Sequence, residues 1–218
     1  MDFTKYALRP GGILLPQGVD YRKWAVIACD QFTSQPEYWA EVEALAGDAP
    51  STLKMIYPEA WLSQGDGRIP RIHESMRRAL EGVLRPATEG FALVERQVST
   101  GTRLGLVAAV DLEQYDYKSG SKALIRPTEA TIPERIPPRM KIRLAAPLES
   151  PHVLLLVDDP GMTLLEPLYE ARAALRSLYD FELMLGGGHV RGWAVEGAAL
   201  ESVARALDAL YAGCGGLL

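Results

Sequence analysis

The sequence predicts an α/β to α+β protein with a mixed β-sheet, and three observations predict it. Residues 24–29 and 152–157 are continuously apolar and rich in β-formers, as expected of strands buried on both faces. Residues 91–99 and 103–112 are β-patterned runs joined through a Thr-Gly-Thr turn, which predicts an antiparallel hairpin. Helical patterns lie between these strands. We therefore expect two central apolar strands, at least one hairpin and about four covering helices.

The helices are predicted from apolar residues that recur three and four positions apart. The clearest case is 69–84, where Ile69, Ile72 and Met76 begin an apolar stripe. His73 lies close to the polar face of this helix, so we interpret it as solvated surface and not as a metal ligand. Three further helices are expected at 35–46, 166–176 and 198–211.

A triple glycine, Gly186–Gly188, separates two further β-patterned runs near the C-terminus. It lacks the spacing of the common phosphate-binding fingerprints, so we interpret it first as a hairpin turn. The second strand of this hairpin would carry His189 and Arg191 on the same side, because side chains alternate along a strand. Both are candidate ligand-binding residues.

Composition limits the function classes. The chain has 218 residues and a net charge of −5, which argues against a nucleic-acid binder with a basic footprint. No apolar run approaches the ~20 residues of a membrane helix, and the first residues lack the layout of a signal peptide. Two cysteines give no disulfide framework. We expect a single domain over 1–218 in the cytoplasm, with no membrane partner. The sequence indicates no particular oligomeric state.

Positive charge is concentrated in residues 121–143, which carry six cations and only two acids, a local charge of +4. Arginine matches carboxylate or phosphate with two parallel hydrogen bonds. Four prolines in the run restrict the backbone and hold these charges on a preorganised track. The alternative interpretation is a solvated helix face. The candidate ligand-binding cations are Lys122, Arg126, Arg135 and Arg139, and the candidate bases are Glu129 and Glu134.

Polar residues follow the first predicted apolar strand, as Cys29, Asp30 and Gln31, and a helix begins shortly after. Proteins of the α/β class commonly place ligands at such a strand end. Asp30 is therefore a third candidate base and Gln31 a candidate ligand-binding residue. The alternative is that Asp30 only caps the turn. Asp158 and Asp159 also follow an apolar strand, but Pro160 and Gly161 come next, which favours a turn.

Cysteine and metal chemistry are the less favoured hypotheses. Cys29 could serve as a thiolate at the strand end, but a single cysteine in an apolar segment is most often a small buried hydrophobe. The two cysteines and three histidines are far apart and show no zinc-ligand spacing. We therefore expect no metal held by the protein itself.

Three blocks of the sequence resemble the bacterial domain-of-unknown-function 1015 family: AVIACDQFTSQPEYW, the long stretch from Gly105 to Pro160, and LYDFELMLGGGHVRGW. The resemblance covers nearly the whole chain and is most specific in the long stretch. It implies that residues 1–218 are the N-terminal portion of a longer architecture. The family motifs fall on Arg126, Glu129, Glu134 and Arg135, and on Cys29, Asp30 and Gln31.

The resemblance also implies a function. The family is similar to the ParB/sulfiredoxin-like fold, whose relatives include nucleotidases, sulfiredoxin and free-serine kinases, through a phosphate-binding block that would lie beyond Leu218. The expected function is therefore binding of an anionic or phosphorylated small molecule, with kinase-like phosphoryl transfer in the complete protein and Mg²⁺ and a nucleotide as the matching cofactors. The alternative is a non-catalytic metabolite-binding or regulatory module. The two differ in whether a positioned base such as Glu129 is needed for turnover or only for affinity.

Overall fold

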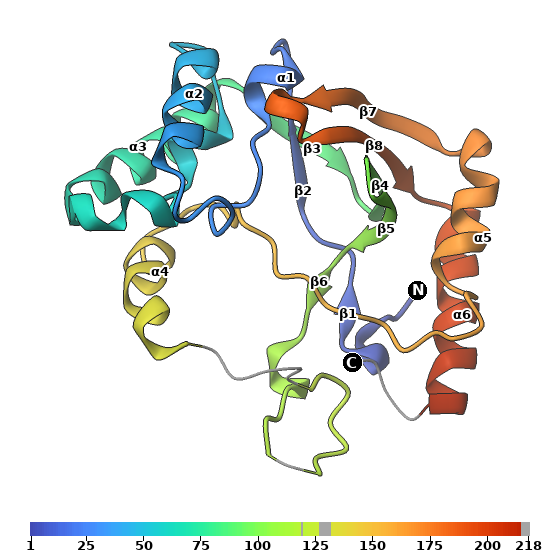
Figure 1. The fold of residues 1–218 in the computed structure, drawn as a ribbon. Coiled ribbons are helices and arrows are strands. Elements are labelled where there is room, and N and C mark those ends of the chain that lie inside the picture. The colour runs from blue at the N-terminus through green and yellow to red at the C-terminus, as the bar shows by residue number, and fades with distance from the viewer. Residues whose placement is uncertain (119, 127–131, 215–218) are drawn as a thin grey trace.

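The computed structural model describes residues 1–118, 120–126 and 132–214 (Figure 1). Glu129, one of the predicted bases, lies outside the described residues. The named strands all pair antiparallel, and helices and strands are interleaved along the chain, so the fold is α+β. The strands are β1 Leu8–Arg9, β2 Ile13–Pro16, β3 Leu84–Thr88, β4 Phe91–Val98, β5 Gly101–Val107, β6 Ala109–Val110, β7 Arg176–Leu183 and β8 Gly188–Val195. The α-helices are α1 Tyr21–Trp24, α2 Pro36–Ala46, α3 Ile69–Gly82, α4 Ile136–Arg143, α5 Leu165–Glu170 and α6 Ala198–Cys214.

The main sheet has four strands in the order β5-β4-β8-β7. The predicted hairpin is present as β4–β5, and the triple-glycine turn joins β7 to β8, as predicted. Two small ribbons, β1–β6 and β2–β3, extend from this sheet. One face of the main sheet is covered by α5 and α6, where Phe91, Leu93, Val203 and Leu207 are almost fully buried.

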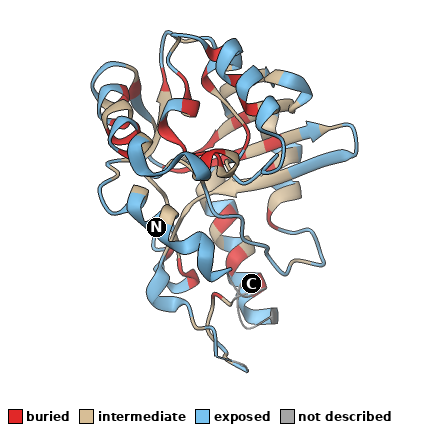
Figure 2. Cartoon of the chain, turned by 60° about the vertical axis from the view of Figure 1, so that its left-hand side comes forward, coloured by how far each residue is buried: buried red, intermediate tan, exposed pale blue. Residues whose placement is uncertain are grey.

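A second core lies beside the sheet, among α2, α3 and the loops that connect them. Its centre is Trp39 on α2, which is fully buried, packed near Trp61 and the Ile72–Met76 stripe of α3. Figure 2 shows the buried residues gathered in these two regions. The amphipathic pattern of α3 is thus explained by burial of its apolar side, as the sequence indicates.

Both predicted central strands are wrong. Residues 25–28 form an irregular segment after α1, although Ile27 is buried against the second core. Residues 152–157 also form no strand and are largely exposed in the connection between α4 and α5. A continuous apolar run predicts that a segment is buried, but it does not show that another strand lies beside it to form backbone hydrogen bonds. The strands that do form the centre are β4 and β8, which pair with each other and are most buried where Phe91, Ala92 and Leu93 meet the C-terminal half of β8.

The predicted helices occur with altered bounds. The predictions at 35–46, 69–84 and 198–211 correspond to α2, α3 and α6. The prediction at 166–176 was too long, because α5 ends at Glu170 and a 3₁₀ turn leads directly into β7. The basic run supplies α4, whose first turn contains Pro137 and Pro138, where proline costs no backbone hydrogen bond.

Candidate anion-binding site

The helix α4 is fixed against α3 by a histidine. The Nε2 atom of His73 lies 2.8 Å from the carbonyl oxygen of Ile142, so this nitrogen carries the proton and donates. His73 is buried, which corrects its interpretation as solvated surface: the ring sits at the α3–α4 contact. This contact sets the orientation in which α4 presents its arginines.

Two of the predicted arginines converge on one carboxylate. Arg139 Nη2 lies 2.6 Å from Glu59 Oε1, and Arg135 Nε lies 3.6 Å from Glu59 Oε2. Residues four apart stand on the same side of a helix, so the α4 region aims both guanidinium groups in one direction. The Glu59 side chain is only 10% exposed, whereas the two arginine side chains are about half exposed, at 45% and 47%. The carboxylate is therefore at the bottom of the cluster and the cations at its rim.

The predicted strand-end motif lies at the same place. The backbone N–H of Glu59 donates to the carbonyl of Cys29 at 2.8 Å, which ties the start of the 3₁₀ helix Glu59–Gln64 to the turn at residues 29–30. Arg139 interacts electrostatically with Asp30 and Cys29. The hydrogen bond with Glu59 raises the pKa of the Arg139 guanidinium, so this cation stays charged. The structure thus brings Arg135 and Arg139 to Glu59, whose backbone is hydrogen-bonded to the turn that carries Asp30.

The backbone of Gln31, the next residue of the motif, is held by a side chain of the second core. The indole Nε1–H of Trp39 donates to the carbonyl of Gln31 at 3.2 Å, while the Gln31 residue itself is exposed. The buried ring therefore fixes the backbone of the turn, and the side chain remains free to face a ligand. This contact couples the second core directly to the site.

Cys29 does not have the surroundings of a reactive thiolate. Burial, and then the negative charge of Asp30, raise the pKa of its thiol. The nearby Arg139 acts in the opposite direction but is the smaller influence. A raised thiol pKa keeps the sulfur protonated near neutral pH, so the geometry favours the structural interpretation of this cysteine.

The hydrogen bonds and ion pairs of the cluster involve none of the other described candidates of the basic run. Glu134 is exposed, and Lys122 is exposed near the start of the described segment 120–126. Arg126 follows the buried Ile125, and its Nε is buried without a hydrogen-bond partner among the described residues. Lys141, on α4, pairs with Asp66 at 2.5 Å and Arg143 with Glu149 at 2.7 Å, both on the surface.

A second polar cluster contains the other two predicted ligand-binding residues. His189 lies between two carboxylates, with Nδ1 2.5 Å from Glu182 Oε1 and Nε2 2.5 Å from Asp180 Oδ1. Arg191 bridges Asp180, at 3.5 Å, and Glu95, at 3.1 Å. His189 and Arg191 share one side of β8, as the alternation predicts. Figure 1 shows the turn of this hairpin at the top of the molecule beside α1, whereas α4 lies lower at the left. No hydrogen bond or ion pair between described residues joins His189 or Arg191 to Arg135 or Arg139, so the structure shows two separate clusters.

Stability should depend on pH through His189. Hydrogen bonds to Glu182 and Asp180 raise its pKa above that of the unfolded chain. Its contribution is therefore full below about pH 6.5 and is lost as pH rises through the folded pKa. We expect the melting temperature to fall over that interval, and His189→Gln to remove this part of the dependence. The control variant His152→Gln, which changes an exposed histidine, should keep the pH dependence of the melting temperature. If the melting temperature of His189→Gln depends on pH in the same way as that of wild type, His189 is not the group responsible.

Sequence reasoning missed two acids that organise these clusters. Glu95 is 2% exposed and shares the inner side of β4 with Phe91 and Leu93. An acid at an inward-facing position of an apolar strand was a usable signal, because buried charges need partners. No sequence pattern identified Glu59, because the residues around it do not indicate a contact with Arg139, which lies 80 positions further along the chain.

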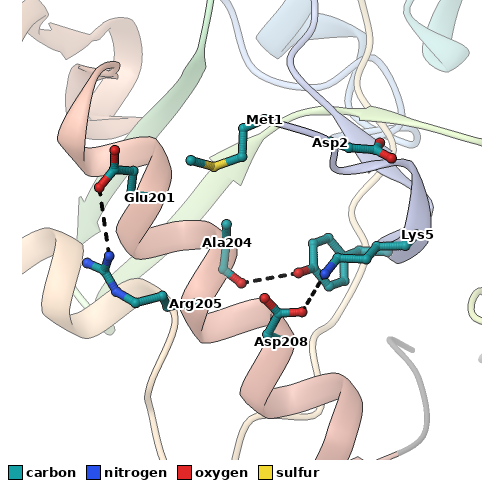
Figure 3. A pocket seen from close by; sticks show the side chains of 8 residues that line it. Met1, Asp2, Lys5, Glu201, Ala204, Arg205 and Asp208 are labelled. Carbon is teal, nitrogen blue, oxygen red and sulfur yellow. Dashed lines mark hydrogen bonds and ion pairs between the residues drawn. The ribbon is translucent and has the colours of Figure 1, made fainter.

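The described residues also line two cavities. A cavity of about 540 Å³ is lined by the N-terminal segment and α6 (Figure 3). Its charges are neutralised internally, because Lys5 pairs with Asp208 at 2.6 Å and Arg205 lies 3.9 Å from Glu201. It contains none of the predicted site residues. A cavity of about 330 Å³ adjoins Cys29 and is lined by residues 25–29, Thr52, Ile56 and 150–152.

The fold and this cluster define an α+β protein with paired arginines beside an irregular turn. The chain belongs to the family described as Protein of unknown function (DUF1015), whose model matches residues 14–213. No curated protein and no solved structure matched the chain. In the part of the chain that the structure describes, no helix has the length and apolar character needed to cross a membrane.

Proposed function

We propose that the chain binds an anionic or phosphorylated small molecule at the cluster of Arg135, Arg139, Glu59 and Asp30. The observation that supports this most strongly is the convergence of two half-exposed arginines on one nearly buried carboxylate. Their guanidinium groups keep unused donors at the surface, because each group has five N–H bonds and Glu59 takes few of them. A ligand can therefore bind without displacing Glu59.

Glu59 acts in this proposal as a built-in counter-ion. It holds both arginines in position before a ligand arrives, which lowers the ordering cost of binding. It also cancels one of their two charges, so the cluster is less positive than the arginines alone. Glu59 therefore lowers the affinity for an anion, but it keeps the two arginines in position and stabilises the site when no ligand is bound.

Phosphoryl transfer is the finer form of the proposal. Such reactions depend mainly on positioning and on stabilising charge, which paired arginines supply. Asp30 would accept the proton of the attacking group, and Mg²⁺ with a nucleotide would be the matching cofactors. A non-catalytic binding module is the alternative. In this alternative, the same arginines hold an anionic metabolite and no positioned base is needed.

Thermal melts with inorganic phosphate test the binding proposal. Ligand at a hundred times its Kd should stabilise the chain by about 2.7 kcal/mol, which is a shift of roughly 5–10 °C for a chain of this size. Arg139→Ala should abolish the shift, because it removes the guanidinium at the centre of the cluster. Lys141→Ala is the matched control, since it removes one positive charge from the same helix but pairs with Asp66 instead.

Equal shifts in both variants would overturn the proposal, because the effect would then be one of general charge. Catalysis is tested separately with Asp30→Asn. If the protein transfers phosphoryl groups from a nucleotide, this variant should lose turnover and keep the melting shift. If it is a binding module, no turnover appears in either protein and the shift persists.

A further inference from the structure

Residues 152–157, His-Val-Leu-Leu-Leu-Val, form an apolar segment on the surface. Val153, Leu154 and Leu156 are 72%, 74% and 60% exposed. A contiguous run of exposed aliphatic side chains is unusual on a soluble monomer and marks an interaction surface. Its backbone is also unpaired: among the described residues, no backbone hydrogen bond joins 153–156 to another segment.

This segment is held at both ends and open in the middle. On one side, Arg143 on α4 donates to the carbonyl of Pro151 at 3.4 Å and pairs with Glu149. On the other, the Asp159 carboxylate accepts the backbone N–H groups of Thr163 and Leu164, at 2.7 and 2.8 Å, which confirms the interpretation of this acid as a turn residue. Figure 1 shows the connection crossing the molecule between α4 and α5. The contacts at its two ends therefore hold the segment in place on the surface.

The sequence of the segment is symmetric about Leu155. Reading outward in both directions gives leucine, then valine, and finally His152 on one side and Asp158 on the other. Antiparallel pairing of two copies centred on Leu155 therefore places leucine opposite leucine and valine opposite valine. It also places the imidazole of His152 of each copy opposite the carboxylate of Asp158 of the other, a pair that can hydrogen-bond at both ends. Proline at 151 and 160 bounds the paired stretch.

We propose that two copies of this chain pair antiparallel through residues 152–158 across a two-fold axis at Leu155. Pairing provides hydrogen-bond partners for the open N–H and C=O groups of this exposed segment. A two-fold contact uses the same patch on both copies, so each favourable pair occurs twice. The near-palindromic sequence and the complementary ends favour a second copy over an unrelated strand.

Cross-linking tests the register. Residue 155 would face itself across the axis, whereas residue 153 would face residue 157. Leu155→Cys should therefore give a disulfide-linked dimer on mild oxidation, and Val153→Cys should give little. The unmodified chain, which contains Cys29 and Cys214, sets the background. Equal cross-linking of the two variants, or none above background in either, would overturn the pairing.

The mass of the protein in solution, and variants that swap the charges at residues 152 and 158, test whether two copies associate. Sedimentation of the unmodified chain should show a species of twice 23.9 kDa whose fraction rises with concentration. His152→Asp and Asp158→Lys should each weaken it, and a mixture of the two variants should restore a dimer containing one copy of each. A monomer up to the solubility limit, aggregates without defined mass, or failure of the mixture to recover would contradict the proposal.

Discussion

Replacing Glu95 with alanine is expected to lower the free energy of unfolding by about 3–5 kcal/mol. The Glu95 carboxylate is buried on the inner side of β4, where it accepts a hydrogen bond from the Tyr169 hydroxyl and pairs with Arg191 at 3.1 Å. Its removal leaves the Tyr169 hydroxyl on α5 without this acceptor and leaves Arg191 with only the more distant of its two carboxylates, Asp180 at 3.5 Å. The hydrogen bond to Glu95 also raises the pKa of the Tyr169 hydroxyl, so this hydroxyl stays protonated and donates to the carboxylate.

Urea unfolding monitored by circular dichroism measures this effect. The matched control is Glu182→Ala, because Glu182 lies on β7 in the same polar cluster but is 64% exposed. An exposed ion pair contributes about 0–1 kcal/mol, so the control should remain close to wild type. Similar losses in the two variants would mean that Glu95 is not the buried centre of the network.

Trp39→Ala is expected to cost about 3–5 kcal/mol, the usual range for deleting a large buried aromatic side chain. Trp39 has no exposed surface and sits at the centre of the core formed by α2 and α3. The substitution also removes the indole donor that holds the Gln31 carbonyl. We therefore expect loss of phosphate binding together with loss of stability.

The Trp39→Phe variant separates the two effects. It retains an aromatic ring in the core but lacks the N–H, so it should lose less stability than alanine and still weaken binding. Leu45→Ala provides the control on the same helix, because Leu45 is 45% exposed and should change stability little. Phosphate affinity unchanged in Trp39→Phe would show that the indole does not position the turn.

The elements that could be predicted from the sequence are those whose pattern repeats. The α3 stripe repeats with the helical period because one side of the helix packs on the second core. The β4–β5 hairpin was predicted instead from two β-rich runs on either side of a Thr-Gly-Thr turn. The two continuous apolar runs failed as strands, since a run without alternation indicates burial but does not specify its neighbour. Residues 25–28 are partly buried because they pack on the second core without forming a strand. Residues 152–157 remain largely exposed in the described part of the chain.

The site was predictable only in part, for a related reason. Charge density identified Arg135 and Arg139, and the change from apolar to polar residues identified Asp30. Their meeting depends on Glu59 and on the His73 contact with α4, which join segments far apart in sequence. His189 and Arg191 were correctly placed on one side of β8, but the sheet directs them to a cluster of their own.

Titration calorimetry of wild type and Glu59→Gln with inorganic phosphate tests the central claim most directly. If Glu59 is the internal counter-ion of Arg135 and Arg139, removing its charge makes the cluster more positive and frees both guanidinium groups. We predict that phosphate binds about tenfold more tightly, or ~1.4 kcal/mol, while the empty protein melts at a lower temperature. Affinity that is unchanged or weaker in a folded Glu59→Gln variant would contradict anion binding at this cluster.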